Sequence, residues 1–294
     1  MVEYDPHQWR TSFFAVRGSM LRPITVRALL VTMAAVLAAI THEFIVSLTW
    51  SEVAATAYGL VGTSLGLLLV FRTNASYDRW WEGRKLWGTL VNTSRNLARS
   101  SLVHLRGDPE RLTRILELVT AFPYAAMHEL RGIRLVPDKL HPQDQAAVAG
   151  AKHLPTAIST RITYHLNEAR RAGVLTDMVF VTLDANCQTQ IDVIGACERI
   201  HKTPLPFAYV VHLRRALVMY CGALPFAFVS RFGWATALVT FMVAYILLGI
   251  EAIGVEIEDP FGGDENDLPL DRICENIEKS VMSLKVDTSQ DGTG

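Results

Sequence analysis

The sequence has few charged residues for its length, and what it lacks already excludes several classes of protein. Asp, Glu, Lys and Arg make up 19% of its 294 residues, against roughly 25% in soluble globular proteins. Half of the residues are hydrophobic and the mean hydropathy is +0.22, which excludes an intrinsically disordered chain. The net charge of −1 gives no reason to expect a nucleic-acid-binding protein.

Short motifs for catalysis and metal binding are also missing. The sequence contains no P-loop, no G-x-G-x-x-G, no H-E-x-x-H and no C-x-x-C. Its four cysteines are scattered, so no disulfide framework is expected. Ser64 lies in a G-x-S-x-G pattern, but a nucleophile elbow needs a strand–turn–helix context, and this pattern lies inside an apolar run. We therefore expect no enzyme.

The hydrophobic residues are concentrated in four runs. Val53–Phe71 and Phe232–Ile250 are uncharged runs of 19 residues each, close to the roughly 20 residues that cross a bilayer. Ala28–Thr41 and Ala216–Ser230 are shorter and span only if flanking residues extend them; the alternative is a buried helix of a soluble domain. Their arrangement in two pairs favours four spans, at about 24–49, 53–73, 205–230 and 232–251.

Basic residues are absent from one side of these runs. No Lys or Arg occurs between residues 28 and 71, and only Arg231 separates the third run from the fourth. Arginines and lysines gather instead before the first run and after the second. Because positive residues stay on the cytoplasmic side, we expect both termini and the long middle segment to be cytoplasmic.

The middle segment has helical periodicity. Trp80 and Trp87 begin an apolar stripe at helical spacing, and no Gly or Pro between residues 67 and 82 would stop a helix that continues from the second span. Gly107-Asp108-Pro109 predicts a stop and restart, and Pro123 predicts a further interruption. No hairpin turn lies between alternating strands, so the chain is expected to be all-α. The expected segments are an N-terminal segment (1–23), a first hairpin (24–73), a cytoplasmic helical domain (74–204), a second hairpin (205–255), an acidic turn and helix (256–279) and a flexible tail (280–294).

One face of the second run carries Thr63, Leu67 and Phe71, which are spaced by four residues and so share a stripe of a helix. Gly62 and Gly66 give the helix a small-residue face. In a symmetric oligomer the bulky stripe would line the axis, where rings of apolar side chains gate by dewetting. The alternative is that these side chains face lipid or the protein core.

Carboxylates occur in two further places. Glu43 and Glu52 lie in or beside an outer loop without basic residues and would concentrate cations at a pore mouth; the alternative is an ordinary interfacial position. Asp264 and Asp267 belong to a dense acidic turn of the kind that suits Ca²⁺, which takes 6–8 oxygen ligands. The alternatives there are a solvated turn or helix capping. Arg214, Arg215 and Glu251, like Glu43 and Glu52, are ionisable residues near membrane depth and are functional candidates by default. The alternative is a position near the end of a span, where a charged side chain reaches the interface at lower cost.

Three motifs together resemble the bestrophin ion-channel family, its bacterial members in particular. They are the stretch Phe71–Gly88 with Arg79-Trp80-Trp81 at its centre, the sequence Asp259-Pro260-Phe261-Gly262, and the sequence Leu205-Pro206-Phe207-Ala208-Tyr209. The resemblance covers nearly the whole chain. It implies a homopentamer around one central pore. Each chain would cross a bacterial inner membrane several times.

The resemblance also implies roles for particular residues. The family's pore neck falls on Thr63, Leu67 and Phe71, although Thr63 departs from the usual bulky apolar residue, and Arg79, Trp80 and Trp81 would support the helix beneath the neck. A second, cytoplasmic aperture is expected somewhere in residues 176–194. Asp264 and Asp267 match side-chain ligands of the calcium clasp of animal members, while Gly263 and Asn266 interrupt its acidic run. No cofactor is required.

The expected function is passive conduction of small monovalent ions, with a cation such as Na⁺ placed ahead of chloride because of the acidic outer loops. The alternatives are a chloride or other anion channel, or a membrane-anchored signalling or scaffold protein that uses residues 74–202 to bind partners. The expected partners are membrane lipid, further copies of the chain and the conducted ions, with no nucleic acid.

Overall fold

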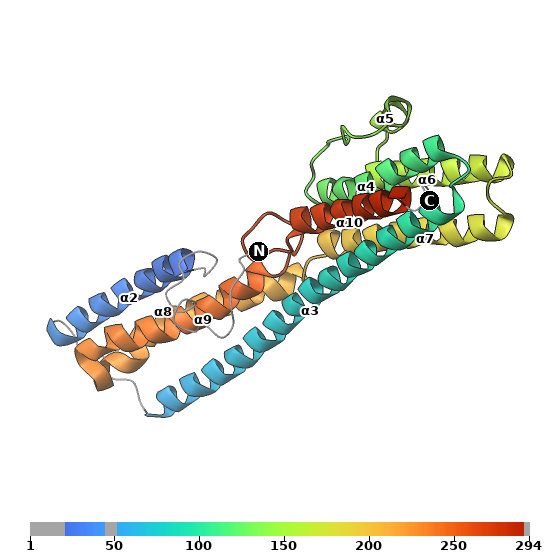
Figure 1. Cartoon of the computed structure of the whole chain (residues 1–294). Helices are drawn as coiled ribbons and strands as arrows, with labels where there is room; N and C mark the ends of the chain where they lie inside the picture. The colour runs from blue at the N-terminus through green and yellow to red at the C-terminus, as the bar shows by residue number, and fades with distance from the viewer. Residues whose placement is uncertain (1–20, 45–51, 291–294) are drawn as a thin grey trace. The chain divides into compact units, whose positions relative to one another are not determined.

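The computed structural model describes residues 21–44 and 52–290, and every regular element in these ranges is a helix (Figure 1). The all-α expectation is therefore confirmed for the described chain. In order, the helices are α2 (Leu21–Phe44), α3 (Glu52–His104), α4 (Pro109–Leu130), α5 (Pro142–Ala149), α6 (Leu154–Arg171), α7 (Asp177–Lys202), α8 (Phe207–Phe232), the 3₁₀ turn η1 (Gly233–Ala235), α9 (Thr236–Glu256) and α10 (Leu270–Gln290).

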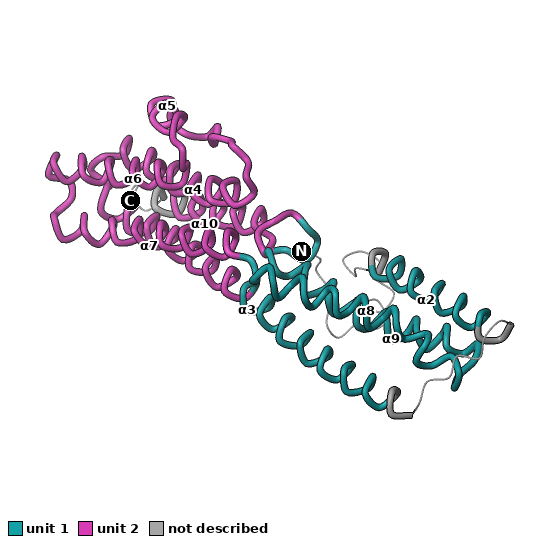
Figure 2. Tube along the Cα trace, turned by 180° about the vertical axis from the view of Figure 1, so that it is seen from behind, with its two compact units in different colours: residues 1–80, 204–259, 264–267 teal, residues 81–203, 260–263, 268–294 magenta. Residues whose placement is uncertain are grey.

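The helices divide between two compact units (Figure 2). Of the described residues, the first unit takes those up to Trp80 together with 204–259 and 264–267. It therefore contains α2, the first part of α3, α8, η1 and α9. The second unit takes 81–203, 260–263 and the residues from Leu268 onwards. It contains the rest of α3, helices α4 to α7, and α10.

The first unit is built from the apolar runs of the sequence. Within the described residues, three stretches are long and apolar enough to cross a membrane: Ile24–Thr41, Thr56–His104 and Phe207–Glu256. The second of them begins in the first unit and continues past Trp80 into residues of the second. The third comprises α8 and α9, between which Gly233 takes a positive φ of +50° that favours glycine. The four expected spans thus fall on α2, the start of α3, α8 and α9, except that the first was expected to reach residue 49, and 45–51 lie outside the described residues.

Small residues allow these helices to approach one another closely. Ala28 of α2 and Ala244 of α9 are fully buried, and they form a cluster with Cys221 and Leu224 of α8. Many large apolar side chains on the same helices point outward instead, among them Met33, Leu60 and Val218. So much exposed apolar surface is typical of a membrane or protein interface and not of a soluble monomer, which agrees with helices surrounded by lipid.

Helix α3 continues without a break for 53 residues, which corresponds to about 80 Å of α-helix. No proline lies within it. Its hydroxyl side chains bond to carbonyls of the preceding turn, as in Thr73 Oγ1 to the Leu69 oxygen at 2.9 Å, so they leave the helix intact. The expectation that the second span runs on into the middle segment is confirmed.

The second unit is an amphipathic helix bundle in which α4 packs on α6 and α10, and α6 packs on α7. The expected restart at Pro109 is present: the Asp108 side chain accepts a hydrogen bond from the Arg111 backbone N–H at 3.1 Å and caps α4. The expected interruption near Pro123 is wrong. Helix α4 continues to Leu130 with Pro123 buried inside it, because the buried neighbours Phe122 and Ala126 hold the helix despite the missing N–H.

Helix α10 corrects a second expectation. The tail was expected to be flexible from residue 280, yet α10 is helical as far as Gln290. Its apolar face explains the extension, because Ile277 and Val281 are spaced by four residues and are both fully buried, and such a stripe anchors a helix through packing. Only the last four residues of the tail lie outside the described chain.

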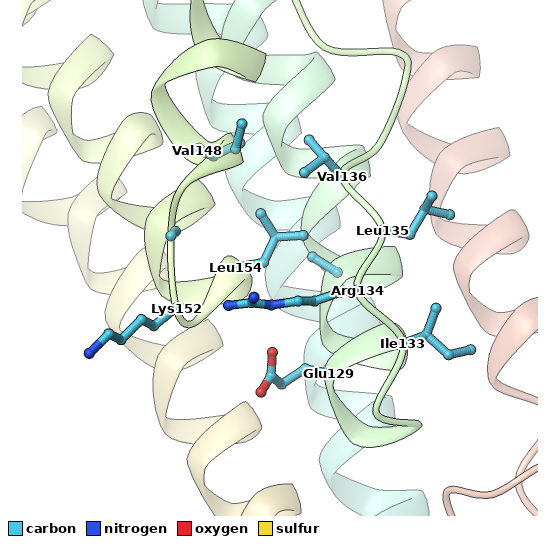
Figure 3. A pocket seen from close by; sticks show the side chains of 11 residues that line it. Glu129, Ile133, Arg134, Leu135, Val136, Val148, Lys152 and Leu154 are labelled. Carbon is cyan, nitrogen blue, oxygen red and sulfur yellow. The ribbon is translucent and has the colours of Figure 1, made fainter.

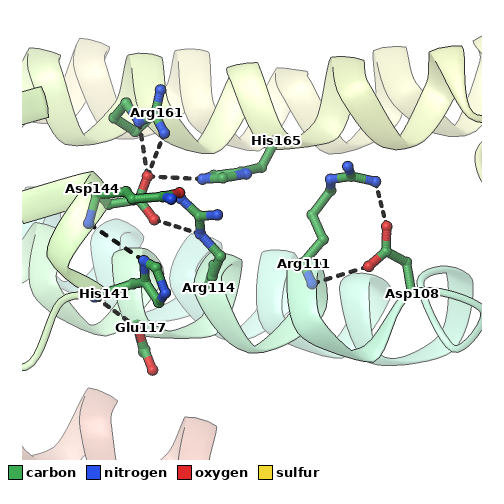
Figure 4. Close-up of polar contacts among 9 residues, drawn as sticks. Asp108, Arg111, Arg114, Glu117, His141, Asp144, Arg161 and His165 are labelled. Carbon is green, nitrogen blue, oxygen red and sulfur yellow. Dashed lines mark hydrogen bonds and ion pairs between the residues drawn. The ribbon is translucent and has the colours of Figure 1, made fainter.

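A buried carboxylate links three helices of this second unit (Figure 4). Asp144 of α5 accepts hydrogen bonds from Arg114 Nε of α4 at 2.8 Å, and from Arg161 Nε and His165 Nε2 of α6, each at 2.9 Å. These hydrogen bonds hold the pKa of Asp144 well below its usual range even though burial opposes ionisation. Burial lowers the pKa of His165. The short helix α5 is therefore held by ion pairs.

Replacing Asp144 tests how much this carboxylate contributes to folding stability. Asp144→Asn leaves the half-buried Arg114 and Arg161 without their buried counter-ion, so we expect the unfolding free energy at pH 7 to fall by about 3 kcal/mol, the lower end of the loss for a broken buried pair. Asp108→Asn is the matched control, because Asn retains the cap and a partly exposed pair with Arg111 contributes about 0–1 kcal/mol. Both are measured by thermal and denaturant unfolding in detergent.

The same experiment has a predicted pH dependence. Because the folded-state pKa of Asp144 is depressed, its stabilisation is complete above the unfolded-state value of about 3.9 and is lost as the pH falls further towards the folded-state pKa. The difference between wild type and Asp144→Asn should therefore be constant from pH 7 to about 5 and shrink below about 4. Equal stability of the two proteins at pH 7 would contradict the assignment.

Candidate functional site

The stripe that the sequence singled out lies on the exposed side of α3. Leu67 and Phe71 are 56% and 58% exposed, and Thr63 is exposed as well. The Thr63 hydroxyl donates to the Gly59 carbonyl at 3.0 Å, so its polar group is satisfied within the helix. The three side chains thus form a continuous surface strip with no charge.

The other side of the same helix is packed. Leu65 and Leu69 are almost completely buried and cluster with Leu213 and Leu217 of α8. One turn earlier, a Cβ added at Gly62 would collide with the Tyr220 side chain, whose ring stacks on Tyr58 at a centroid distance of 4.4 Å. The packed side fixes the rotation of α3 about its axis, so that the stripe of Thr63, Leu67 and Phe71 is directed away from α8.

A cluster of charges begins at the residue after Phe71. Arg72 is only 1% exposed, and its Nη1 and Nη2 lie 3.6 Å from Glu251 Oε1 and 3.5 Å from Glu258 Oε2. Glu251, also buried, lies 2.9 Å from Arg214 Nε and 3.7 Å from Arg27 Nη1. These five residues, the Arg72 cluster, join α2, α3, α8, α9 and the turn after α9. Buried charges are tolerated only when paired, so this cluster restricts how the four helices can be arranged.

The sequence pointed to Glu251 and Arg214 but not to Arg72, which also pairs with Glu251. The only local signal is that Arg72 directly follows 19 uncharged residues, which is equally expected of an arginine at a membrane surface. The structure decides between a buried arginine and one at the membrane surface, because Arg72 is almost completely buried. Glu258 was not singled out either, because it lies in a run of acidic residues.

The Arg79-Trp80-Trp81 motif connects α3 to the turn after α9. Arg79 Nε donates to the Glu258 carbonyl at 2.9 Å, and Trp80 Nε1 donates to the Asn266 carbonyl at 3.3 Å. Glu258 also accepts the Leu205 backbone N–H through Oε1 at 2.9 Å. Arg72 and Arg79, two helical turns apart, therefore both contact Glu258. Trp81, in the second unit, is about half exposed.

The acidic turn brings Asp264 and Asp267 together. Asp267 Oδ2 accepts the Asp264 backbone N–H at 2.7 Å, while its Oδ1 is buried without a hydrogen-bond partner. Burial, with the neighbouring charges of Asp264, Asp259 and Glu256, raises the pKa of Asp267 to about 6. A buried carboxylate oxygen without a donor needs a partner such as an ion or a water, and Asp267 Oδ1 could serve a cation in this way. The assignment of Asp264 and Asp267 as calcium ligands stays a prediction.

Two further expectations concern the outer mouth and the cytoplasmic aperture. The side chains of Glu43 and Glu52 lie outside the described ones, so nothing is added to the outer-mouth hypothesis. In the range 176–194, which was expected to hold a second aperture, α7 exposes the large apolar side chains Met178 and Val181, at 81% and 64%. They are spaced by three residues and share one face of the helix.

Comparison with known proteins places the chain among membrane channels. A family described as "Bacterial/Fungal Bestrophin protein" matches residues 1–283. A voltage-dependent anion channel-forming protein of Nostoc sp. is 36% identical, over 94% of this chain and 91% of the relative. One of Synechocystis sp. is 41% identical, over 75% and 74%, and one of Escherichia coli K12 is 30% identical, over 97% and 94%.

Solved structures agree with the sequence comparison. The crystal structure of a bacterial bestrophin homologue from Klebsiella pneumoniae, determined by Zn-SAD phasing, has a TM-score of 0.82 and 30% sequence identity, covering 88% of this chain and 97% of that chain. The crystal structure of a point mutant of the Klebsiella homologue has a TM-score of 0.83 and 29% identity, covering 89% and 98%.

The raised pKa of Asp267 gives a prediction for the acidic turn. Because the folded state favours the protonated carboxyl, ionised Asp267 costs stability, and that cost appears as the pH rises from about 3.9 through about 6. Asp267→Asn keeps an oxygen for the Asp264 N–H and removes the charge, so we expect a Tm above that of the wild type at pH 8. The difference should vanish below about pH 4.

The measurement is a series of melts in detergent from pH 4 to 8 with EDTA present, so that no bound cation offsets the charge. Asp271→Asn is the control. Asp271 pairs with Arg131 at 2.9 Å and its pKa is lowered, so this variant should be destabilised at pH 8. A lower Tm for Asp267→Asn at pH 8 would contradict the predicted charge cost.

Proposed function

Since the chain belongs to the bacterial/fungal bestrophin family, a family of membrane channel proteins and not of enzymes, we propose that it forms a homopentamer that passively conducts small monovalent ions. The observation that carries the proposal is the uncharged strip of Thr63, Leu67 and Phe71 on the exposed side of a helix whose opposite side is packed. Copies of α3 arranged around an axis would turn this strip inward.

The neck would work by excluding water. Rings of Leu67 and Phe71 make a narrow apolar passage that ions cross only when it is wide enough to be wetted. The Thr63 ring contributes a smaller side chain whose hydroxyl is already bonded within the helix. It therefore neither seals the passage as a larger apolar residue would nor offers a charge to the ion. Because the strip is uncharged, the neck sets conductance more than it sets the sign of the ion.

The residues after the neck would hold it in place. Arg72 forms an ion pair with Glu258, and Arg79 donates a hydrogen bond to the Glu258 carbonyl. Trp80 donates a hydrogen bond to the Asn266 carbonyl. These contacts oppose rotation of α3, which would carry Leu67 and Phe71 off the axis. When Ca²⁺ is bound at Asp264 and Asp267 it would supply positive charge to the same turn. Conduction through the neck does not require it. Met178 and Val181 of α7 would line the second, cytoplasmic aperture.

Two observations bear on the sign of the conducted ion and point in opposite directions. The first outer loop carries Glu43 and Glu52 and no basic residue, and the second contains only Arg231, a balance that favours cations. The curated relatives are named anion channel-forming proteins, which favours anions. We place a cation such as Na⁺ first, because the carboxylates belong to this chain, and chloride second. The distribution of basic residues supports a bacterial inner-membrane location with both termini inside.

The neck assignment is tested by widening it. Leu67→Ala with Phe71→Ala should raise the single-channel or macroscopic current in planar bilayers severalfold, because smaller side chains weaken dewetting. Val61→Ala is the matched control: it lies on the same helix and is exposed, but its position six residues before Leu67 places it about 120° around the helix from that side chain. Mass measurement in detergent should give five copies for all three proteins.

The outcomes separate the alternatives. An unchanged current in the double variant would contradict the neck. A protein that is monomeric, or that carries no current while it captures a defined partner, would support the scaffold alternative and overturn the channel.

Ion selectivity is tested by the reversal potential of purified protein in asymmetric NaCl. A cation channel shifts the reversal potential towards the Na⁺ equilibrium value and an anion channel shifts it towards that of Cl⁻. Glu43→Gln with Glu52→Gln should reduce the cation preference, and the loss should be smaller at high salt because surface charges are screened. A wild-type shift towards the Cl⁻ value would overturn the cation choice and support the anion channel.

A further inference from the structure

Three potential metal ligands meet in the second unit, away from the strip and the acidic turn. They are Glu129 in the last turn of α4, His153 at the start of α6, and Glu198 in α7. One ligand atom from each residue lies within 4.8 Å of the others, and all three residues are half-buried. The three come from different elements, so their convergence is a product of the tertiary fold and not of one helix face.

The hydrogen bonds of His153 define what metal binding at its Nε2 atom requires. Nδ1 accepts the Thr156 backbone N–H at 3.2 Å and lies 2.6 Å from Thr156 Oγ1, so the ring proton is assigned to Nε2, which faces Glu198 Oε1 at 3.1 Å. A metal that replaces this proton requires Nδ1 to carry one. Thr156 Oγ1 is in place to accept it, and such an outer partner is found for nearly all metal-bound histidines. The tautomer change gives up the hydrogen bond from the Thr156 backbone N–H that caps α6, which lowers the expected affinity.

A cavity adjoins one of the three ligands, Glu129. It has a volume of about 200 Å³ and is lined by Glu129, by both neighbours of His153 and by Arg134 (Figure 3). Three protein ligands leave a coordination position open on a tetrahedral ion, and the cavity has room for the water that would fill it. The Glu129 carboxylate is directed into this space in Figure 3.

Cations near the site compete with a metal. Lys202 Nζ lies 3.4 Å from Glu198 Oε1, and Lys152 and Arg134 line the cavity. The Lys202 side chain is 67% exposed, so it can move into solvent at little cost when a metal takes its place. This competition predicts moderate affinity, and it offers a variant that should bind more tightly.

From this geometry we propose that Glu129, His153 and Glu198 bind a divalent transition metal ion, for which Zn²⁺ is the best probe. One imidazole nitrogen and two carboxylate oxygens match its ligand preferences. The bound ion would link the end of α4, the connection that precedes α6, and α7. It would therefore stabilise the second unit, and this inference does not depend on whether the protein conducts ions.

The test measures zinc binding to the full-length, tag-free protein in detergent, after dialysis against EDTA and then buffer. Isothermal titration with ZnCl₂ should give one site per chain, and Zn²⁺ should raise the Tm. The thiols of Cys187 and Cys197 do not compete, because they are buried and burial raises the pKa of each to about 12.

Variants at the ligands give the decisive comparison. His153→Asn keeps an oxygen to cap α6 but removes the metal-binding nitrogen, and Glu198→Gln keeps the size of its side chain. Each should weaken Zn²⁺ binding at least about tenfold, which is the loss that even an outer-shell partner can cause. Lys202→Gln should tighten binding severalfold. His104→Ala, at an exposed histidine of the same unit, should change nothing.

The melts also show whether each variant is folded. A variant that melts cooperatively without Zn²⁺ but gains no Tm from it is folded and has lost the site. Absence of a stoichiometric site in the wild type would overturn the proposal. Binding that survives His153→Asn and Glu198→Gln would also overturn it, because the zinc would then lie elsewhere. A failure of the channel measurements would leave these zinc results unaffected, so the two proposals fail separately.

Discussion

The pairing of buried Arg72 with Glu251 and Glu258 is the constraint on which the first unit depends. A guanidinium that is 1% exposed is tolerated only where carboxylates meet it, and its two partners come from α9 and from the turn that follows α9. Because Arg214 and Arg27 share Glu251, one carboxylate sets the mutual positions of four helices. Apolar packing alone specifies these positions less sharply, since lipid tails are as apolar as the side chains and no hydrophobic driving force acts between helices in a membrane.

The Arg72 cluster lies directly beside the proposed neck in the sequence. Arg72 directly follows Phe71, so the residue that fixes the rotation of α3 lies next to a residue proposed to form the neck. Leu65 and Leu69 on the packed side act in the same direction. The exposure of Leu67 and Phe71 is therefore enforced by what lies behind them. In the second unit, Asp144 has the corresponding role, because it joins α4, α5 and α6 through charged hydrogen bonds.

Patterns that depend on neighbouring residues were predicted well from the sequence. The uninterrupted α3, the stop at Gly107–Pro109 and the absence of strands in the described chain all follow from local propensity and periodicity. Pro123 and the tail were predicted wrongly for a common reason. Proline and polar residues weaken a helix locally. The buried residues Phe122 of α4 and Val281 of α10 stabilise their helices by tertiary packing, which local propensities do not include.

The sequence by itself determined that the chain is helical, that its apolar residues form membrane-length runs, and that Thr63, Leu67 and Phe71 share a helix face. Only the tertiary structure decided which charges pair, because Arg72 and Glu258 are 186 residues apart, and Glu129, His153 and Glu198 come from three separate elements. The physical reason is the range of the interactions. Helical periodicity repeats every few residues along one segment, whereas the cost of burying a charge is settled by whichever distant segment supplies its partner.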